Sequence, residues 1–176
     1  MITNWISLWG ALSWHGVAPA VRQTPDSALL RRFGDAVNST SDTLESLRGL
    51  AQAFRNDLQT ASPTLILARA TSVHDACASG ASAVRRLQGI LAARTVSNTA
   101  ARSQAKFRTT AEETVAVLDR CVRSWLPLPR TDERADSLRA WGPFRIAQLD
   151  QALRRYDAAR HAFANAAGLP AEPTKH

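Results

Sequence analysis

The sequence predicts an all-α protein: an antiparallel up-down-up-down four-helix bundle, with a short extra helix before the last long helix and an apolar N-terminal segment. Two observations carry this prediction. Four long segments place apolar residues at alternating spacings of three and four, which is the period of a helix with one buried face. Capping residues and prolines mark the ends of these segments, and the connections between the first three are so short that neighbouring helices must run antiparallel.

The first two helices are predicted from matching start signals. Thr24 before Pro25, and Ser62 before Pro63, each place a capping side chain ahead of a proline at the first helical position. The predicted core stripe of the first helix is Leu30, Phe33, Val37, Thr40, Leu44, Leu47, Ala51, Phe54 and Leu58. The predicted core stripe of the second is Ile66, Ala70, Val73, Cys77, Gly80, Val84, Leu87 and Leu91.

The second half of the chain predicts a third helix, a brief helix and a last long helix. The third is expected to start near Thr99 and to end before Pro127, because proline cannot continue the hydrogen-bond ladder. A brief helix capped by Thr131 follows, and we expect the Trp141-Gly142-Pro143 sequence to break it from the last helix, which stops at Gly168. The predicted stripes are Phe107, Ala111, Thr114, Leu118, Cys121 and Trp125 in the third helix, and Ile146, Leu149, Leu153, Tyr156, Arg160, Phe163 and Ala167 in the last.

Folding the second predicted helix onto the third places the two cysteines, Cys77 and Cys121, at the same level. If the helices approach closely there, their Cα atoms reach the separation of about 5.5 Å that a disulfide requires. The sequence therefore predicts a disulfide if the protein is exported, and two buried thiols if it remains in a reducing cytosol.

Residues 1–20 form the apolar N-terminal segment. No Asp, Glu, Lys or Arg precedes Arg22, and the run from Trp5 to Trp14 is almost wholly apolar. One interpretation is a signal peptide cleaved after Ala20, which would make the protein secreted or periplasmic. A second is an interfacial helix that contacts a membrane or a partner, and a third is a plain packing arm; a cytoplasmic location stays open. The residues that would make the interfacial contact are Trp5, Leu8, Trp9 and Leu12.

The rest of the chain divides into a bundle domain, residues 21–170, and a flexible tail, residues 171–176. Its charge is uneven: the net charge is +7, and no acidic residue lies between Asp75 and Glu112. The sequence therefore predicts a basic tip around the second turn, able to bind an anionic surface of lipid or nucleic acid, with an ordinary solvated face as the simpler reading. The candidate polyanion-binding residues are Arg85, Arg86, Arg94, Arg102, Lys106 and Arg108.

No catalytic, metal-binding or cofactor-binding motif is present in the sequence. We therefore expect a non-enzymatic interaction protein, exported or membrane-associated, that binds another macromolecule, in the first place a protein, through a bundle face or the basic tip. The alternative is a carrier that holds a small ligand or cofactor in a pocket between the helices.

Overall fold

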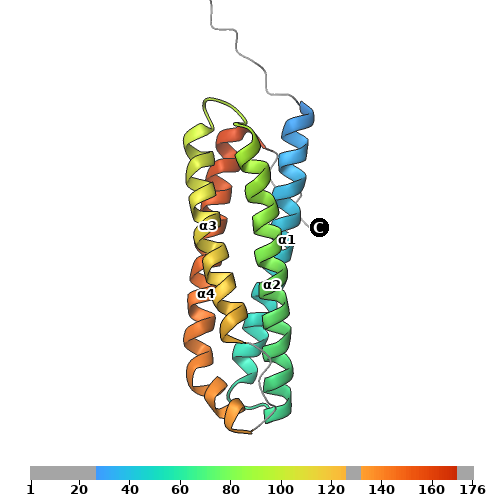
Figure 1. The fold of residues 1–176 in the computed structure, drawn as a ribbon, viewed down its shortest axis with the longest axis vertical. Coiled ribbons are helices and arrows are strands. Elements are labelled where there is room, and N and C mark those ends of the chain that lie inside the picture. The colour runs from blue at the N-terminus through green and yellow to red at the C-terminus, as the bar shows by residue number, and fades with distance from the viewer. Residues whose placement is uncertain (1–26, 126–131, 170–176) are drawn as a thin grey trace, which may run out of the picture.

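The computed structural model describes residues 27–125 and 132–169, which fold into four helices. They are α1 (Ser27–Asp57), α2 (Pro63–Ala93), α3 (Ala101–Ser124) and α4 (Asp132–Ala167). Figure 1 shows them side by side as one elongated bundle in which consecutive helices run in opposite directions. Each helix packs on the next, and α4 also packs on α1 and α2, which closes the bundle. The predicted up-down-up-down fold is confirmed.

The four predicted stripes are the core. Every residue assigned to them is buried except Leu30, which is partly buried against the core. An apolar stripe of this width is removed from water only when its helix faces the other three helices. The periodicity of the sequence therefore accounts for which face of each helix is buried.

Side chains close the helix ends. Ser62 Oγ accepts a hydrogen bond from the Leu65 N–H at 3.4 Å, as its position before Pro63 predicted. At the end of α1, where no glycine is present, the Arg139 guanidinium donates to the carbonyl oxygens of Leu58 at 3.1 Å and Ala61 at 2.9 Å. Thus α4 supplies the cap of α1.

The last helix stops where the sequence predicted. Gly168 adopts φ of +66°, a conformation that glycine enters without steric penalty. The Leu169 N–H then donates to the Ala164 carbonyl at 3.0 Å, which satisfies a carbonyl at the helix end.

The disulfide between Cys77 and Cys121 is formed, with a Cα separation of 6.2 Å. One layer further along, a Cβ atom on Gly80 would lie 3.6 Å from Leu118 Cδ1 and 3.6 Å from Leu47 Cδ2. These contacts place Gly80 opposite Leu118, which is the register of α2 on α3 that follows from the predicted level of the two cysteines.

The predicted extra helix is wrong, because α4 runs unbroken from Asp132 through Pro143. In Figure 1 the first turns of α4 slant beneath the end of the bundle before the helix straightens. A proline inside a helix costs about 3 kcal/mol, since it removes a hydrogen bond and its ring meets the preceding turn. The buried stripe crosses it without losing register, so packing on both sides holds the segment helical: Ala135, Leu138, Gly142, Ile146 and Leu149.

Several sequence predictions lie outside the described residues. They are the cap at Thr24 and Pro25, the segment 1–20, the cap at Thr131 and the tail 171–176.

Candidate functional site: the basic end of the bundle

Most of the unbalanced charge lies at one end of the bundle, which we call the basic end. It comprises residues 28–38 of α1, residues 86–112 of α2, α3 and their connection, and residues 158–169 at the end of α4. These residues hold eight Arg or Lys and two acidic residues, Asp35 and Glu112. The remaining described residues hold eleven Arg and eleven Asp or Glu, so their charges cancel. The basic residues of this end are Arg31, Arg32, Arg86, Arg94, Arg102, Lys106, Arg108 and Arg160.

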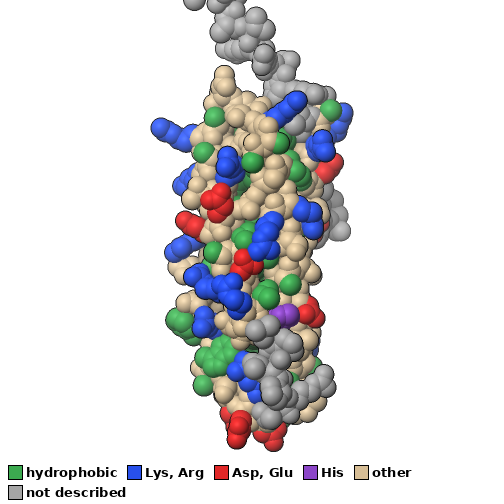
Figure 2. Space-filling view, viewed as in Figure 1, with side chains coloured by type: hydrophobic (Ala, Val, Ile, Leu, Met, Phe, Trp, Pro, Cys, Tyr) green, Lys and Arg blue, Asp and Glu red, His purple; other side chains and the backbone are tan. Residues whose placement is uncertain are grey.

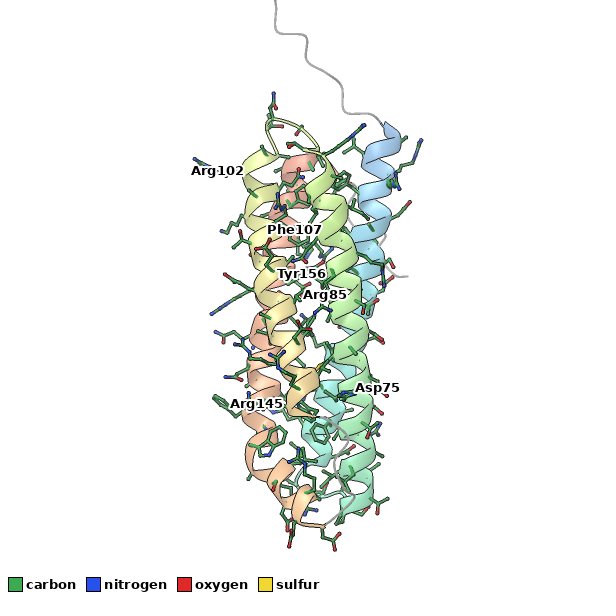
Figure 3. All side chains as sticks on the ribbon, viewed as in Figure 1. Asp75, Arg85, Arg102, Phe107, Arg145 and Tyr156 are labelled. Atoms are coloured by element: carbon green, nitrogen blue, oxygen red, sulfur yellow. A yellow bond between two sulfur atoms is a disulfide. The ribbon has the colours of Figure 1, made fainter. Side chains whose placement is uncertain are left out.

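Seven of these eight residues are exposed, all but Arg160. None of the seven forms an ion pair with another residue of ranges 27–125 and 132–169. Figure 2 shows Lys and Arg side chains on the upper part of the molecule as well as along its middle, and in Figure 3 Arg102 extends from α3 away from the bundle. The basic end therefore presents cations whose attraction for an anion is not already used by a carboxylate.

Five of the six predicted polyanion-binding residues lie at the basic end. The exception is Arg85, whose guanidinium donates to both carboxylate oxygens of Asp119 at 2.6 Å and joins α2 to α3 on the side of the bundle. The Arg85 side chain is half exposed, but its charge is already paired with a carboxylate that joins the two helices.

Sequence reasoning missed Arg31 and Arg32. They lie more than fifty residues before Arg86, so a search for local runs of charge passes over them. Counting residues outward from the short connection at Ser62 places Phe33 opposite Leu91 and brings the first turns of α1 to the level of the second turn. This count is the signal that could have found them.

A buried glutamine holds the turn of the basic end. Gln104 on α3 is 5% exposed and points back at the end of α2. Its Nε2 group donates to the carbonyl oxygens of Leu91 at 2.8 Å and Arg94 at 2.7 Å, and its Oε1 atom accepts from the Val96 N–H at 3.0 Å. The backbone that carries Arg94 is thereby fixed relative to the first turn of α3.

A groove of about 540 Å³ lies between α1 and α2 at the same end. Its apolar lining includes Phe33 and Ile90, and three small residues leave the space open: Ala28, Gly89 and Ala93. Its charged lining consists of three of the exposed arginines, Arg32, Arg86 and Arg94. Among the residues that the structure describes, no acidic side chain lines it.

An aromatic cluster forms the rigid base beneath this end. Phe107 and Phe163 stack with centroids 5.5 Å apart, Phe33 lies 6.4 Å from Phe163, and Phe107 lies 5.2 Å from Tyr156. Figure 3 shows Phe107 and Tyr156 inside the bundle. Burial raises the pKa of the Tyr156 phenol far above its ordinary value, so this hydroxyl stays neutral.

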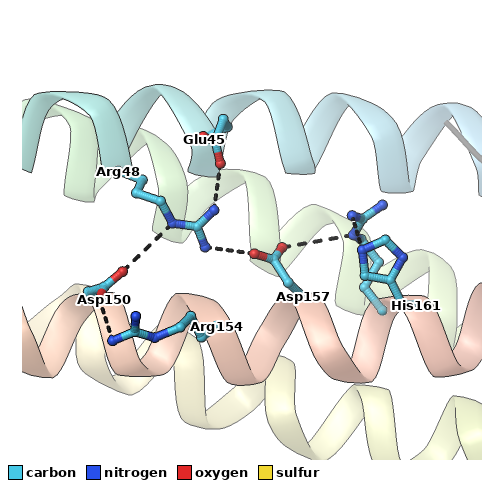
Figure 4. A network of polar contacts seen from close by, with 7 residues as sticks. Glu45, Arg48, Asp150, Arg154, Asp157 and His161 are labelled. Atoms are coloured by element: carbon cyan, nitrogen blue, oxygen red, sulfur yellow. Dashed lines mark hydrogen bonds and ion pairs between the residues drawn. The ribbon is translucent and has the colours of Figure 1, made fainter. Parts of the chain in front are cut away.

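The largest polar network of the described residues has a structural role. Figure 4 shows Arg48 of α1 bonded to Asp157 of α4 at 2.6 Å and to Glu45 at 2.5 Å, with Asp150 3.9 Å away. Asp150 also pairs with Arg154 at 2.5 Å. Because Arg48 joins α1 to α4 and Arg154 pairs with Asp150 within α4, these carboxylates are already bonded to arginines and the network leaves little free charge for a ligand.

The remaining chemistry of the described residues is sparse. In ranges 27–125 and 132–169, no three His, Cys, Asp or Glu side chains gather as metal ligands. No helix within the same ranges is long and apolar enough to cross a membrane. The interfacial residues proposed from the sequence, Trp5, Leu8, Trp9 and Leu12, lie outside the described part.

Comparison of the chain with protein-family models, with curated proteins and with solved structures finds no match.

Proposed function

We propose that this protein is a non-enzymatic helical bundle that binds an anionic surface through its basic end. The observation that supports the proposal most directly is the separation of charge: seven exposed cations without carboxylate partners in the described part gather at one end, while the rest of the bundle is nearly neutral. Such a molecule is attracted end-on to a negative surface, and the attraction weakens as salt screens it.

An anionic membrane surface fits the basic end better than nucleic acid does. Within the described part, the large exposed apolar side chains are Leu65 and Phe144, which lie at the opposite end, so the basic end offers no aromatic ring for stacking on bases. It offers instead a groove with an apolar floor.

The compartment forms part of the same proposal. A disulfide between α2 and α3 is typical of proteins in an oxidising environment, and the apolar N-terminal segment supports export. Mass analysis of the mature protein, with and without reductant, tests this directly. A chain that begins at Met1 and carries two free thiols would contradict export.

A second function, carriage of a small ligand between α1 and α2, is favoured by the groove at the basic end, whose volume lies in the range of ligand pockets. Native mass spectrometry of the purified protein tests it. A bound small molecule that survives purification would support carriage, and a protein of bare mass under gentle ionisation would count against it.

Sedimentation with lipid vesicles tests the main proposal. The protein is mixed with vesicles that contain or lack phosphatidylglycerol, at low and at high salt. Cations near an anionic bilayer contribute about 1 kcal/mol each, so changing four of them to Gln is expected to lower the partition coefficient roughly a thousandfold. The four are Arg31, Arg102, Lys106 and Arg108.

The matched control makes the same change of net charge outside the basic end, at four exposed arginines that form no ion pair within the described part: Arg55, Arg123, Arg145 and Arg155. We expect this variant to keep most of its vesicle binding. An equal loss in both variants would overturn the proposal, because net charge and not its position would then decide binding. Binding to a nucleic-acid duplex but to no vesicle would likewise contradict the choice of a membrane.

A further inference from the structure

We propose that the groove between α1 and α2 takes up one anionic phospholipid from the membrane surface to which the basic end binds, with the headgroup held by Arg32, Arg86 and Arg94. This inference rests on the proposed function and names the lipid contact within it. In this groove, exposed arginines and apolar side chains line the same open space.

The lining is amphipathic in the way a lipid is. Arg86, Gly89 and Ala93 follow one another at helical spacings along α2, while Ala28 and Arg32 lie on the facing turns of α1. The arginines supply planar donor groups that match a phosphate. Ile90, Ala28 and Ala93 supply the accessible apolar surface for an acyl chain, above the buried Phe33 ring.

Charge complementarity favours an anion over a neutral lipid. Each of the three arginines is exposed, and none of them pairs with a carboxylate of the described residues. The four other exposed cations of the basic end surround the same end of the bundle, so an anionic bilayer that faces the end would present its headgroups directly to the groove.

A glycine makes the groove testable without disturbing the core. A Cβ atom on Gly89 would meet nothing within 4 Å, so Gly89→Leu places a side chain in open space at the lining of the groove. Gly49 on α1 is a matched control, since it is also exposed, also helical, has nothing within 4 Å of its Cβ position and does not line the groove. Both changes replace a helical glycine by a better helix former and should leave the protein folded.

The experiment compares three probes: vesicles containing phosphatidylglycerol, heparin, and monomeric dihexanoyl phosphatidylglycerol. Heparin presents anions without acyl chains, so it reports on charge alone. If the groove binds lipid, Gly89→Leu weakens vesicle binding roughly tenfold, the effect of excluding about two methylene groups, and abolishes saturable binding of the monomeric lipid. Heparin binding is unchanged, and Gly49→Leu behaves as the unmodified protein does.

A second pair of variants tests the headgroup contact at equal net charge. Arg32→Gln/Arg86→Gln/Arg94→Gln should lose the monomeric lipid, whereas Arg31→Gln/Arg102→Gln/Arg108→Gln should retain it, although both weaken binding to heparin.

The failures can be told apart. If Gly89→Leu binds vesicles and monomeric lipid as well as the unmodified protein does, the groove inference is overturned while the membrane proposal stands. If the unmodified protein binds neither vesicles nor heparin, the proposed function fails. Saturable binding of the monomeric lipid would then assign the groove to a carrier instead.

Discussion

Replacing Gln104 by methionine should destabilise the bundle through the turn of the basic end. Methionine has nearly the same length as glutamine but cannot form hydrogen bonds of comparable strength. The change therefore leaves the cavity filled and removes three hydrogen bonds: two donated to the carbonyl oxygens of Leu91 and Arg94, and one accepted from the Val96 N–H.

The expected magnitude follows from the burial of these groups. Val96 is 5% exposed and lies beside the equally buried Gln104, so its N–H has little access to water once the amide oxygen is gone. A buried donor without a partner costs about 1 to 3 kcal/mol, and each of the two carbonyl oxygens loses a smaller contribution. We therefore expect the free energy of unfolding to fall by about 3 kcal/mol, which corresponds to a melting temperature roughly 9 °C lower.

Urea unfolding followed by circular dichroism measures the change. Gln88 is the matched control, because its Nε2 group is buried and has no hydrogen-bond partner among the described residues. Gln88→Met should leave stability unchanged or slightly raised. A typical hydrogen bond contributes about 1 kcal/mol to stability. If the free energy of unfolding of Gln104→Met lay within about 0.5 kcal/mol of that of the unmodified protein, less than one such bond would have been lost. The turn would then not depend on this amide, which would refute the prediction.

Replacing Cys77 and Cys121 together by Ala should lower the free energy of unfolding by about 4 kcal/mol in the chain-entropy model, since the bridge joins residues 44 positions apart. Urea unfolding with and without reductant measures this change. We expect the variant to be as stable as the unmodified protein is after reduction. Tyr156→Phe removes a buried hydroxyl without a hydrogen-bond partner in the described part, so calorimetry should find stability equal or raised at neutral pH. Because burial raises the pKa of this phenol, the unmodified protein should lose stability as pH rises above the ordinary value of about 10, and the variant should lose less. Gly142→Leu should cost about 1 to 3 kcal/mol by overpacking, because even a Cβ atom there would lie 3.0 Å from Leu58 Cδ1; thermal unfolding checks it, and an unchanged melting temperature would contradict it.

The core and the register were predictable because both follow from local spacing. Residues three and four positions apart lie on one face of any helix, whatever that helix packs against. The stripe that contains Val73 and Cys77 could therefore be predicted without knowledge of tertiary contacts. The short connection between the second and third helices, before Thr99, then left only an antiparallel arrangement of the two. With that partner fixed, the level of Cys77 and Cys121 followed from counting residues.

The continuity of α4 was not predicted, because local and tertiary signals disagree at Pro143. The local signals, glycine and proline in succession, indicate a break. Packing overrides them, since Leu138 and Ile146 lie on one buried stripe on either side of the proline. The free energy gained by burying their apolar surface exceeds the penalty of about 3 kcal/mol for a proline inside a helix. The small Gly142 allows Leu58 to approach there.

By itself the sequence determined four helices, their buried faces, their direction and the level of the two cysteines, because each of these depends on spacing within one segment or across one short turn. The tertiary structure alone decided which charges stay free. Arg85 is paired with Asp119, which lies 34 residues away, and Arg31 and Arg32 join the basic end although they belong to the first helix. Whether a cation meets a carboxylate depends on the side chains that distant segments place within a few ångströms, and no local pattern records that distance.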